Sequence, residues 1–431
     1  MLNSAIYGLD YGLKTGGHIT MGFLFKLAWR NLWRHPKRTI MTIFAMTLTS
    51  ALFIFMLAFQ MGSYNAMKVN ALSLLDGFGQ FQQADYLDTP SLRNSFDIQP
   101  QLQNQLNQLP GLVVTAYRIQ AFGLLSAGDN NQRNQGAMVL AVQPQVEPQI
   151  SRLAKLVKQG RFLTANDSNQ LVIGEALAQL LDVSIGDEIQ LLGQDKEGSL
   201  AADIFTLVGI FNSGTADLDR QLVLMPFDYA QVLFSMENQA HQLAIISESF
   251  QQIEQLEPQL LALAEQHNLT YRNWRELQPG VAQGIDLDYY SGFIWYVAIL
   301  FIVVLILFNT LLMSVLERER EFGLMLSLGL SRQQLAWLTQ LETHFTLGLG
   351  LIFGIISGIL ITLYFYQTGI TIPGTEEMFA QYGMDATTYP NLTQMAIWFA
   401  PGFLWLSTWL MSAMIVWRIY SLHPLSGRQT K

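Results

Sequence analysis

The sequence contains no cysteine, and charged residues make up only 13% of its 431 residues. The missing cysteines exclude disulfides and thiolate metal sites, and they suit an oxidising compartment. No Gly-x-x-x-x-Gly-Lys-Ser/Thr motif occurs, so the chain has no phosphate-cradling loop of its own. The six histidines are scattered without metal-ligand spacing. We therefore expect no metal site, no bound cofactor and no ATP hydrolysis by this chain alone.

Basic residues are scarce between residues 61 and 292, where 12 Lys and Arg stand against 25 Asp and Glu. This acidity argues against a nucleic-acid partner, which would need a basic face. Acidic pairs such as Asp187 with Glu188, or Asp217 with Asp219, imitate a glycosidase dyad. As solvated turn residues they need no catalytic role, so we expect no catalytic site here.

Long apolar runs are the main positive feature of the sequence. Half of the residues are apolar. Four runs contain no Asp, Glu, Lys or Arg and are long enough for a helix to cross about 30 Å of hydrocarbon. The predicted spans are 39–60, 293–316, 343–366 and 395–417. Because ion-coupled carriers need ionisable groups near the membrane midplane, these uncharged spans disfavour that class.

From residue 61 the hydrophobic period shortens and turn residues appear, which predicts a soluble α+β domain over 61–292. Strands are predicted at 112–117, 137–142, 171–173, 188–192, 204–211, 222–225 and 243–246. Helices are predicted at 99–108, 175–181, 229–234 and 250–267, and residues 160–234 are expected to form an inserted sub-lobe. The predicted fold class is an α-helical membrane protein with four transmembrane helices and an α+β extracytoplasmic domain inserted between helices 1 and 2.

The distribution of basic residues predicts the orientation, because Lys and Arg accumulate on the cytoplasmic side of membranes. They precede the first span, lie between the second and third spans (317–342) and follow the fourth (418–431), whereas 367–394 contains none. Both termini are therefore expected in the cytoplasm, with the large domain and the 367–394 loop in the periplasm. Residues 1–20 lack the apolar core of a signal peptide, and we expect a disordered extension.

Residues 21–38 predict a basic amphipathic helix that lies in the membrane interface. Its basic face comprises Lys26, Arg30, Arg34 and Lys37, opposite apolar residues such as Leu24 and Ala28. The alternative interpretation is a plain positive flank that only sets the topology.

The third predicted span carries glycine at every fourth position, at Gly350, Gly354 and Gly358. This spacing gives one smooth helix face for close packing. Contact with a second copy and packing within the chain are both open at this point.

Five ionised residues, Glu317 to Glu321, end the second span, and an apolar stripe follows over 322–329. A solvated helix end with Glu317 and Arg320 paired three residues apart would explain the charges. It would leave the stripe exposed, so we favour a docking surface. Gly329 predicts a turn, and Ser331 predicts the N-cap of the next helix.

These residues resemble a known family. The string SVLEREREFGLMLSLG at 314–329 resembles the coupling segment after the second span of the FtsX, LolC/LolE and MacB permeases. LAWRNLWR at 27–34, followed by Lys37, Arg38 and Thr39, is similar to the start of that family's membrane domain. VSIGDEI at 183–189 resembles a turn of the MacB-like periplasmic core.

The resemblance implies a non-enzymatic permease subunit of a type VII ABC system in the bacterial inner membrane. ATP and Mg would be bound by two copies of a separate ATP-binding subunit, and a second permease subunit would complete a homo- or heterodimer. Membrane lipid and a periplasmic lipoprotein or accessory protein are the other implied partners. The residues implied in coupling to the ATPase subunit are Glu317, Arg318, Glu321, Gly323, Leu326, Leu328 and Gly329.

The implied function is mechanotransmission: ATP hydrolysis moves the periplasmic domain, which extracts or exports a lipoprotein, peptide or other amphiphile. The alternative is an FtsX-like regulator of a periplasmic cell-wall hydrolase or sensor, without transport. The sequence leaves the cargo and the type of dimer open.

Overall fold

The computed structural model describes residues 21–127, 133–371, 373–374 and 386–420. The predicted disordered extension 1–20 and the tail from residue 421 lie outside the described residues. The chain divides into two compact units. The helical unit comprises Met1–Ser63, Asp288–Gly369 and Tyr389–Lys431, and the sheet unit comprises Tyr64–Leu287 and Ile370–Thr388.

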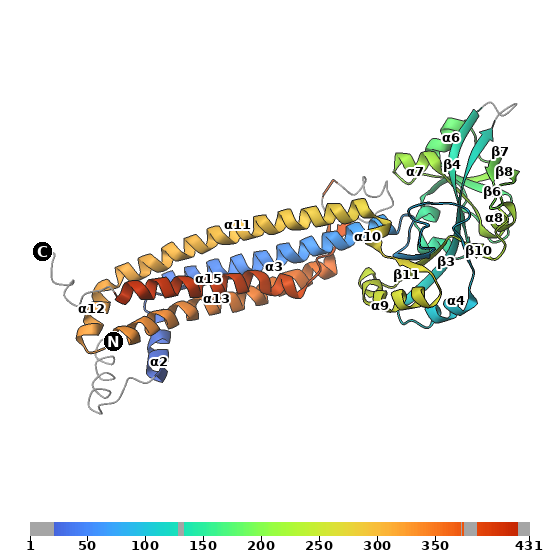
Figure 1. Ribbon diagram of the computed structural model, residues 1–431. Coiled ribbons are helices and arrows are strands. Elements are labelled where there is room, and N and C mark those ends of the chain that lie inside the picture. Colours follow the sequence, from blue (N-terminus) through green and yellow to red (C-terminus); the bar gives the residue numbers. More distant parts are fainter. Residues whose placement is uncertain (1–20, 128–132, 372, 375–385, 421–431) are drawn as a thin grey trace. The chain divides into compact units, whose positions relative to one another are not determined.

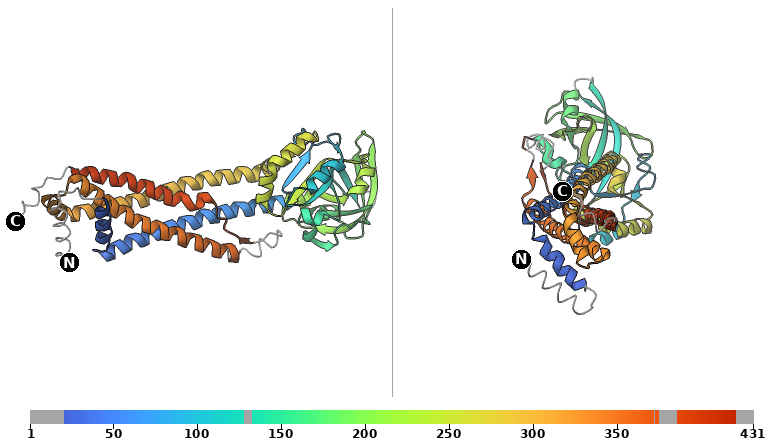
Figure 2. Two further views of the ribbon diagram at one scale, coloured as in Figure 1. Left: turned by 90° about the horizontal axis from the view of Figure 1, so that it is seen from below. Right: turned by 90° about the vertical axis from the view of Figure 1, so that its left-hand side faces the viewer.

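Four helices in the described part of the chain are long and apolar enough to cross a membrane. They are α3 (Pro36–Leu72), α11 (Pro279–Glu317), α13 (Arg332–Thr368) and α15 (Gln394–Tyr420), which Figures 1 and 2 show running side by side. Each predicted span lies inside one of these helices, and the residues at which the chain enters and leaves the membrane stay predictions. Two shorter helices, α2 (Met21–Leu32) and α12 (Glu319–Ser327), belong to the same unit.

The core of the helical unit receives apolar side chains from all four long helices. Met46 of α3, Leu300 of α11, Leu347 of α13 and Leu404 of α15 are members of one buried cluster. Burial of such residues stabilises the contact mainly through close packing, because lipid tails are as apolar as the helix core.

The three spaced glycines of α13 face α3. A Cβ atom added to Gly350 would lie 2.6 Å from Cβ of Met46, and one added to Gly354 would lie 2.5 Å from Cβ of Ser50. Gly358 also meets atoms of α3. No side chain fits at such distances, so glycine allows the two backbones to approach closely. The glycine face is therefore occupied within the chain.

The predicted amphipathic helix over 21–38 is interrupted, since α2 ends at Leu32 and α3 begins at Pro36. Proline lacks an N–H group and disfavours the helical conformation of the residue before it, here His35. The four basic residues are therefore divided among α2, the turn and the first turn of α3: Lys26, Arg30, Arg34 and Lys37.

One 10-stranded sheet forms the sheet unit, in the order β12-β1-β11-β3-β4-β9-β6-β8-β5, with β7 pairing β3 and β8. The strands are β1 (Gly79–Gln82), β3 (Leu112–Ala127), β4 (Arg133–Val142), β5 (Val157–Gly160), β6 (Gln170–Gly174), β7 (Glu188–Gln194), β8 (Leu200–Phe211), β9 (Leu222–Pro226), β11 (Gln242–Ser247) and β12 (Thr270–Arg272). Two small sheets pair β2 (Phe96–Asp97) with β10 (Gln239–Ala240), and β13 (Ile370–Thr371) with β14 (Thr387–Thr388). All seven predicted strands are confirmed.

Short helices connect the strands: α4 (Pro100–Asn107), α5 (Glu147–Ile150), η2 (Leu153–Leu156), α6 (Glu175–Leu181), α7 (Ala216–Gln221), α8 (Phe227–Leu233), α9 (Phe250–Gln266) and α10 (Trp274–Leu277). The four predicted helices correspond to α4, α6, α8 and α9. The long strand β3 pairs with β11 along its first half and with β4 and β7 along its second. The strands of the expected sub-lobe thus join the same sheet as the flanking strands, and the predicted fold class is confirmed.

A buried ion pair fixes the segment that follows α3 within the sheet unit. Arg118 and Glu147 are 1% and 0% exposed, and the arginine donates to both carboxylate oxygens, at 2.5 and 3.2 Å. Its remaining terminal nitrogen donates to the carbonyl of Leu75 at 2.6 Å. Burial raises the pKa of the adjacent Asp76, although Gln278 and Arg118 oppose the shift.

His241 is a buried histidine whose two ring nitrogens have fixed roles. Its Nδ1 accepts from the backbone N–H of Gln120 at 3.1 Å, and its Nε2 lies 3.3 Å from the carbonyl of Leu92. Nδ1 is therefore unprotonated and Nε2 carries the hydrogen. Burial lowers the pKa of His241 to about 4, and the nearby charge of Lys196 acts in the same direction.

Candidate functional site

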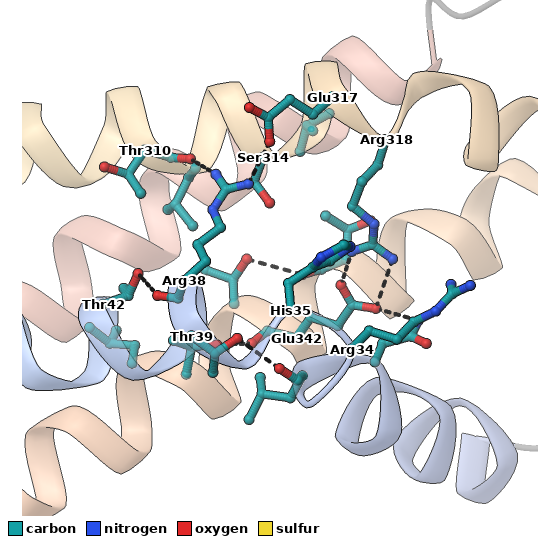
Figure 3. A pocket seen from close by; sticks show the side chains of 18 of the residues that line it. Arg34, His35, Arg38, Thr39, Thr42, Thr310, Ser314, Glu317, Arg318 and Glu342 are labelled. Carbon is teal, nitrogen blue, oxygen red and sulfur yellow. Dashed lines mark hydrogen bonds and ion pairs between the residues drawn. The ribbon is translucent and has the colours of Figure 1, made fainter. Parts of the chain in front are cut away.

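A cavity of about 660 Å³ lies at one end of the helical unit, where the α2–α3 turn meets α11, α12 and α13. Its lining includes charged or titratable side chains that are at least partly exposed, which we call its mouth and which Figure 3 labels: Arg34, His35, Arg38, Glu317, Arg318 and Glu342. Buried apolar residues form the rest of the lining, which we call its interior, among them Met46, Leu307 and Leu347. The lining of this one cavity therefore combines a polar mouth with an apolar interior.

Arg318 connects the residues around this cavity. It stands between the last residue of α11 and the first of α12, with φ −98° and ψ 6°, and its side chain turns toward α13. Its guanidinium donates through Nη1 to Oε2 of Glu342 and through Nη2 to Oε1 at 3.4 Å. Its Nε donates to Glu321 of α12 at 3.2 Å. One side chain therefore ties the base of α12 to α13.

Burial disfavours the charged guanidinium of Arg318, which is 16% exposed. Hydrogen bonds and charge from Glu342 and Glu321 outweigh this penalty, so the pKa of Arg318 is raised. Arg318 therefore stays positively charged at any physiological pH.

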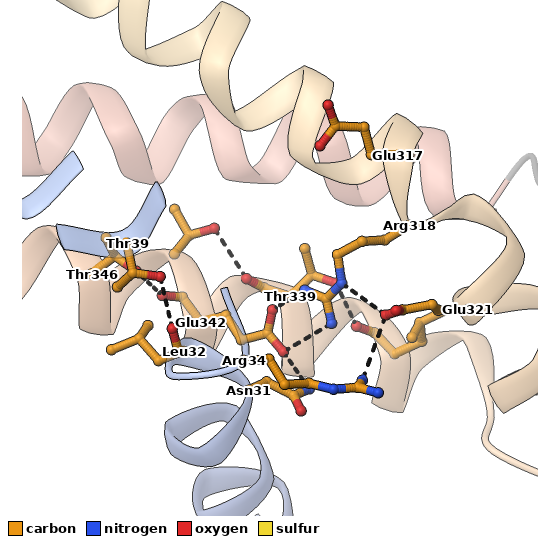
Figure 4. A network of polar contacts seen from close by, with 12 residues as sticks. Asn31, Leu32, Arg34, Thr39, Glu317, Arg318, Glu321, Thr339, Glu342 and Thr346 are labelled. Carbon is orange, nitrogen blue, oxygen red and sulfur yellow. Dashed lines mark hydrogen bonds and ion pairs between the residues drawn. The ribbon is translucent and has the colours of Figure 1, made fainter. Parts of the chain in front are cut away.

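Glu342 also receives a contact from α2, as Figure 4 shows. The amide nitrogen of Asn31 donates to Oε1 of Glu342 at 2.7 Å. Arg34, in the turn after α2, lies 3.7 Å from Glu321, with both side chains partly exposed. The network thus joins α2, α12 and α13 through the two carboxylates.

A second polar contact joins α3 to α11. Arg38 donates to Glu317 at 2.8 Å and to the backbone carbonyl of Thr310 at 2.8 Å. Glu317 therefore pairs with a residue of another helix rather than with Arg320, which is exposed. Glu317 itself stays 62% exposed at the end of α11, whereas Arg318 turns inward and is 16% exposed. The interpretation as a solvated helix end therefore fails for Arg318.

The α12 helix packs through one side and exposes the other. Phe322 is 1% exposed and contacts Val315 and Leu335, with the partly buried Leu326 beside them. Leu324 and Leu328 are 65% and 55% exposed. Gly329 follows in a left-handed conformation (φ 99°), and Ser331 caps α13 in a capping box with Gln334, both as predicted.

The predicted coupling residues thus occupy three environments. Glu317, Arg318 and Glu321 enter the polar network, Leu326 packs inside, and Leu328 points outward. A Cβ atom on Gly323 or Gly329 would meet nothing within 4 Å, although the positive φ of Gly329 still favours glycine. Their role in coupling stays a prediction.

Sequence reasoning missed Glu342, Asn31 and Arg38 as members of the site. The sequence offered one indication that Glu342 belongs to the site, because it is the single carboxylate within α13. An ionised residue in such a helix generally faces a partner or a cavity. Nothing local in the sequence predicts that the partner is Arg318.

The α2 helix packs on α13 through one face and leaves basic and aromatic residues outside. Leu24, Ala28 and Leu32 are buried, and the first two share a cluster with Leu338. Lys26 and Arg30 are exposed, as is Lys37 in α3. The exposed aromatic residues are Phe25, Trp29 and Trp33, at 54%, 44% and 49%.

A second cavity, of about 690 Å³, lies in the sheet unit between the segment before β2 and the β7–β8 hairpin. Phe122 and Leu200 on its lining are 60% and 76% exposed, and Arg93 and Lys196 stand beside them. This cavity combines apolar surface with two cationic side chains and one carboxylate, that of Asp195.

Comparison with known proteins assigns both parts of the chain. Residues 293–424 match the FtsX-like permease C-terminal family, and residues 39–263 match the MacB-like periplasmic core domain. The chain is an FtsX-like permease with a MacB-like periplasmic core domain. This confirms the resemblance seen in the sequence. FtsX-like permeases of this type are non-catalytic transmembrane subunits of ABC systems, so the chain is a multi-pass membrane protein with an extracytoplasmic domain.

Individual relatives of this permease are distant. The lipoprotein-releasing system transmembrane protein LolC of Neisseria meningitidis serogroup B is 20% identical over 232 residues, which are 52% of this chain and 56% of the relative. The match therefore spans little more than half of that protein.

Two solved structures are also similar. The periplasmic region of MacB from Actinobacillus actinomycetemcomitans is 14% identical with a TM-score of 0.35, covering 50% of this chain and 95% of that one. The extracellular domain of the ABC-type transporter YknZ from Gram-positive bacteria is 14% identical with a TM-score of 0.33, covering 46% and 98%.

Proposed function

We propose that this FtsX-like permease couples ATP hydrolysis on a separate ATP-binding subunit to motion of its extracytoplasmic domain. Two ATP-binding subunits, which hold ATP and Mg, and a second permease subunit complete the proposed assembly. The motion extracts or exports a lipoprotein, a peptide or another amphiphile. The permease itself contributes no catalytic residue.

The observation that carries this proposal is the arrangement of α12. Its base is held by Arg318 against α13, and its inner face is buried through Phe322. Its outer face presents Leu324 and Leu328 at high exposure. An anchored helix with an outward apolar face is suited to dock in a groove of a partner and to pass a displacement to the membrane helices.

The proposed orientation places α2, α12 and both termini in the cytoplasm. Basic residues support it, since Lys26, Arg30, Arg34, Lys37, Arg320 and Arg332 all lie at the end of the helical unit that carries α12. ATP-binding subunits in the cytoplasm would then have direct access to α12.

An amphiphilic cargo is supported by two observations. The relative from Neisseria is named for a lipoprotein-releasing system. The cavity beside Phe122 in the sheet unit offers apolar surface next to Arg93 and Lys196, which outnumber the one lining carboxylate, Asp195, as an amphiphile with an anionic part would require.

The test is copurification of the full-length permease from native membranes, with ATPase assays on the complex. Leu328→Asp should reduce the recovered ATP-binding subunit at least tenfold, because it places a charge in an apolar contact. Leu180→Asp, a leucine of similar exposure (48%) in the sheet unit, is the matched control. Equal recovery from both variants would contradict the docking role of α12.

Reconstituted vesicles then separate transport from regulation. ATP-dependent release of a lipoprotein or peptide supports the transporter. A stable complex with a cell-wall hydrolase, without any release, would instead support a transmembrane regulator.

A further inference from the structure

We infer that the cavity at the α2–α3 turn binds an anionic phospholipid, with the headgroup at its mouth beside Lys37 and Arg34 and the apolar part in its interior. This inference goes beyond the proposed function and does not depend on which cargo is moved. It rests on three observations: the balance of charges around the cavity, the change from polar mouth to apolar interior, and the aromatic residues beside it.

The carboxylates of the cavity are already matched by arginines. Glu317 pairs with Arg38, and Glu342 pairs with Arg318, which also reaches Glu321. No hydrogen bond or ion pair joins the side chain of Lys37 to another residue that the structure describes. The lining holds four cationic side chains, Arg34, Lys37, Arg38 and Arg318, against the three carboxylates of Glu317, Glu321 and Glu342, so one positive charge is left for a phosphate to neutralise.

Among the arginines of the cavity, Arg34 is the one best placed to bind the lipid phosphate. Its contact with Glu321 spans 3.7 Å, and its side chain is 52% exposed, so solvent weakens the attraction. Glu321 keeps a closer partner in Arg318, at 3.2 Å. Arg34 can therefore turn to a phosphate without leaving a carboxylate unpaired, and its planar fork suits phosphate oxygens.

The interior of the cavity suits the apolar part of a lipid. Met46 and Leu347 line it and belong to the core of the helical unit. Met46 stands ten residues along α3 from Pro36, about 15 Å at the rise of an α-helix. A soluble anion would contact only the charged mouth, whereas the acyl chain of a lipid would also occupy the apolar interior.

The surface beside the mouth has the composition of a membrane interface. Trp29 and Trp33 are exposed and lie near each other, with ring centroids 6.4 Å apart. Exposed tryptophans among lysines and arginines are typical of helices that lie at the headgroup level of a bilayer. Clusters of four or more basic residues next to a transmembrane helix are typical of binding to anionic lipid.

The experiment is native mass spectrometry of the full-length permease in detergent. Three probes are titrated: phosphatidylglycerol, phosphatidylcholine with the same acyl chains, and glycerol 3-phosphate. We expect phosphatidylglycerol to bind at least tenfold more tightly than either of the others. Equal binding of the two lipids would overturn the inference. Glycerol 3-phosphate binding as tightly as phosphatidylglycerol would also overturn it, because the ligand would then be a free phosphate.

Charge variants test whether the site is local. Lys37→Gln should weaken phosphatidylglycerol binding roughly fivefold, the effect of about 1 kcal/mol per basic residue near a lipid headgroup, and Arg34→Gln should act similarly. Arg320→Gln removes one exposed charge from α12 at the same end of the unit and should leave binding unchanged. An equal loss in Arg320→Gln would show diffuse attraction and refute the site.

A variant inside the cavity tests whether the lipid enters the interior, and it changes no charge. Thr42 lines the cavity and is half-buried, with its hydroxyl donating to the carbonyl of Arg38 at 3.1 Å. Thr42→Phe should reduce phosphatidylglycerol binding by filling the interior. Undiminished binding to a variant that elutes and melts like the wild type would show that the lipid stays outside the cavity.

Discussion

Removal of the Glu342 carboxylate should release α12 from α13. Glu342→Ala eliminates the two hydrogen bonds from Arg318 and the one from Asn31. Breaking a fully buried ion pair costs about 3–5 kcal/mol. Here Arg318 and Glu342 are 16% and 12% exposed, and Glu321 still compensates the guanidinium. We therefore expect local opening of α12 to become easier by about 2 kcal/mol, which is about 30-fold in the opening equilibrium.

Hydrogen exchange measured by mass spectrometry on the full-length permease in nanodiscs reads this opening directly. Peptides from residues 319–327 should exchange about 30-fold faster in Glu342→Ala. Glu342→Gln should give a smaller increase, because its amide oxygen still accepts a hydrogen bond from Arg318. Arg320→Ala is the control, since the side chain is exposed on the same helix. Unchanged exchange in α12, or equal acceleration throughout α3 and α13, would refute the anchoring role of Glu342.

Three further predictions concern packing and burial. Gly354→Leu should lower the melting temperature of the detergent-purified protein markedly, because its Cβ meets α3 at 2.5 Å, whereas Gly348→Leu, with nothing within 4 Å, should be tolerated. The folded-state pKa of His241, about 4, lies below its usual 6.5, so the unfolded chain binds the proton first as pH falls. His241 should therefore lower the free energy of unfolding by about 3 kcal/mol between about pH 6.5 and 4. Because the raised pKa of Asp76 acts in the opposite direction, the effect is measured in urea titrations as the difference between the wild type and His241→Gln. Glu147→Gln leaves the Arg118 charge buried and should destabilise the sheet unit by about 3–5 kcal/mol, seen as faster proteolysis within it.

The sequence predicts the four long helices and seven of the strands because burial there follows a local period. The four uncharged runs predict four long helices, and the alternating pattern around β8 predicts a strand with one buried face. The turn at Gly329 and the cap at Ser331 are equally local, since one residue and its near neighbours determine each.

Strand β1 escaped prediction for a physical reason. Its four residues are all buried, yet two of them are glutamines, Gln80 and Gln82. Burial of such side chains requires hydrogen bonds. Gln80 donates to the carbonyl of Asp76 at 2.8 Å, and Gln82 donates to Gln80 at 2.5 Å. A pattern that treats glutamine as exposed cannot find this strand.

The polar network around Arg318 and Glu342 could not be predicted from the sequence, because the residues in contact are far apart along the chain. Asn31 and Glu342 are 311 positions apart, and Arg38 and Glu317 are 279 apart. Helix packing brings them together, and helix packing depends on faces such as the glycine face of α13. A hydropathy profile locates each helix without stating which neighbour it meets.

The break in the helix at Arg318 explains why the charged string differs from an ordinary solvated helix end. A continuous helix through 317–321 would place Glu317 and Arg320 on neighbouring positions of one face, where they would pair with each other. Because α11 ends at Glu317 and α12 begins at Glu319, Arg318 turns inward to Glu342 while Glu317 meets Arg38. The same charges thus connect four helices instead of pairing along one. A displacement of α12 would therefore act on α13 through Arg318, and through Glu342 on α2.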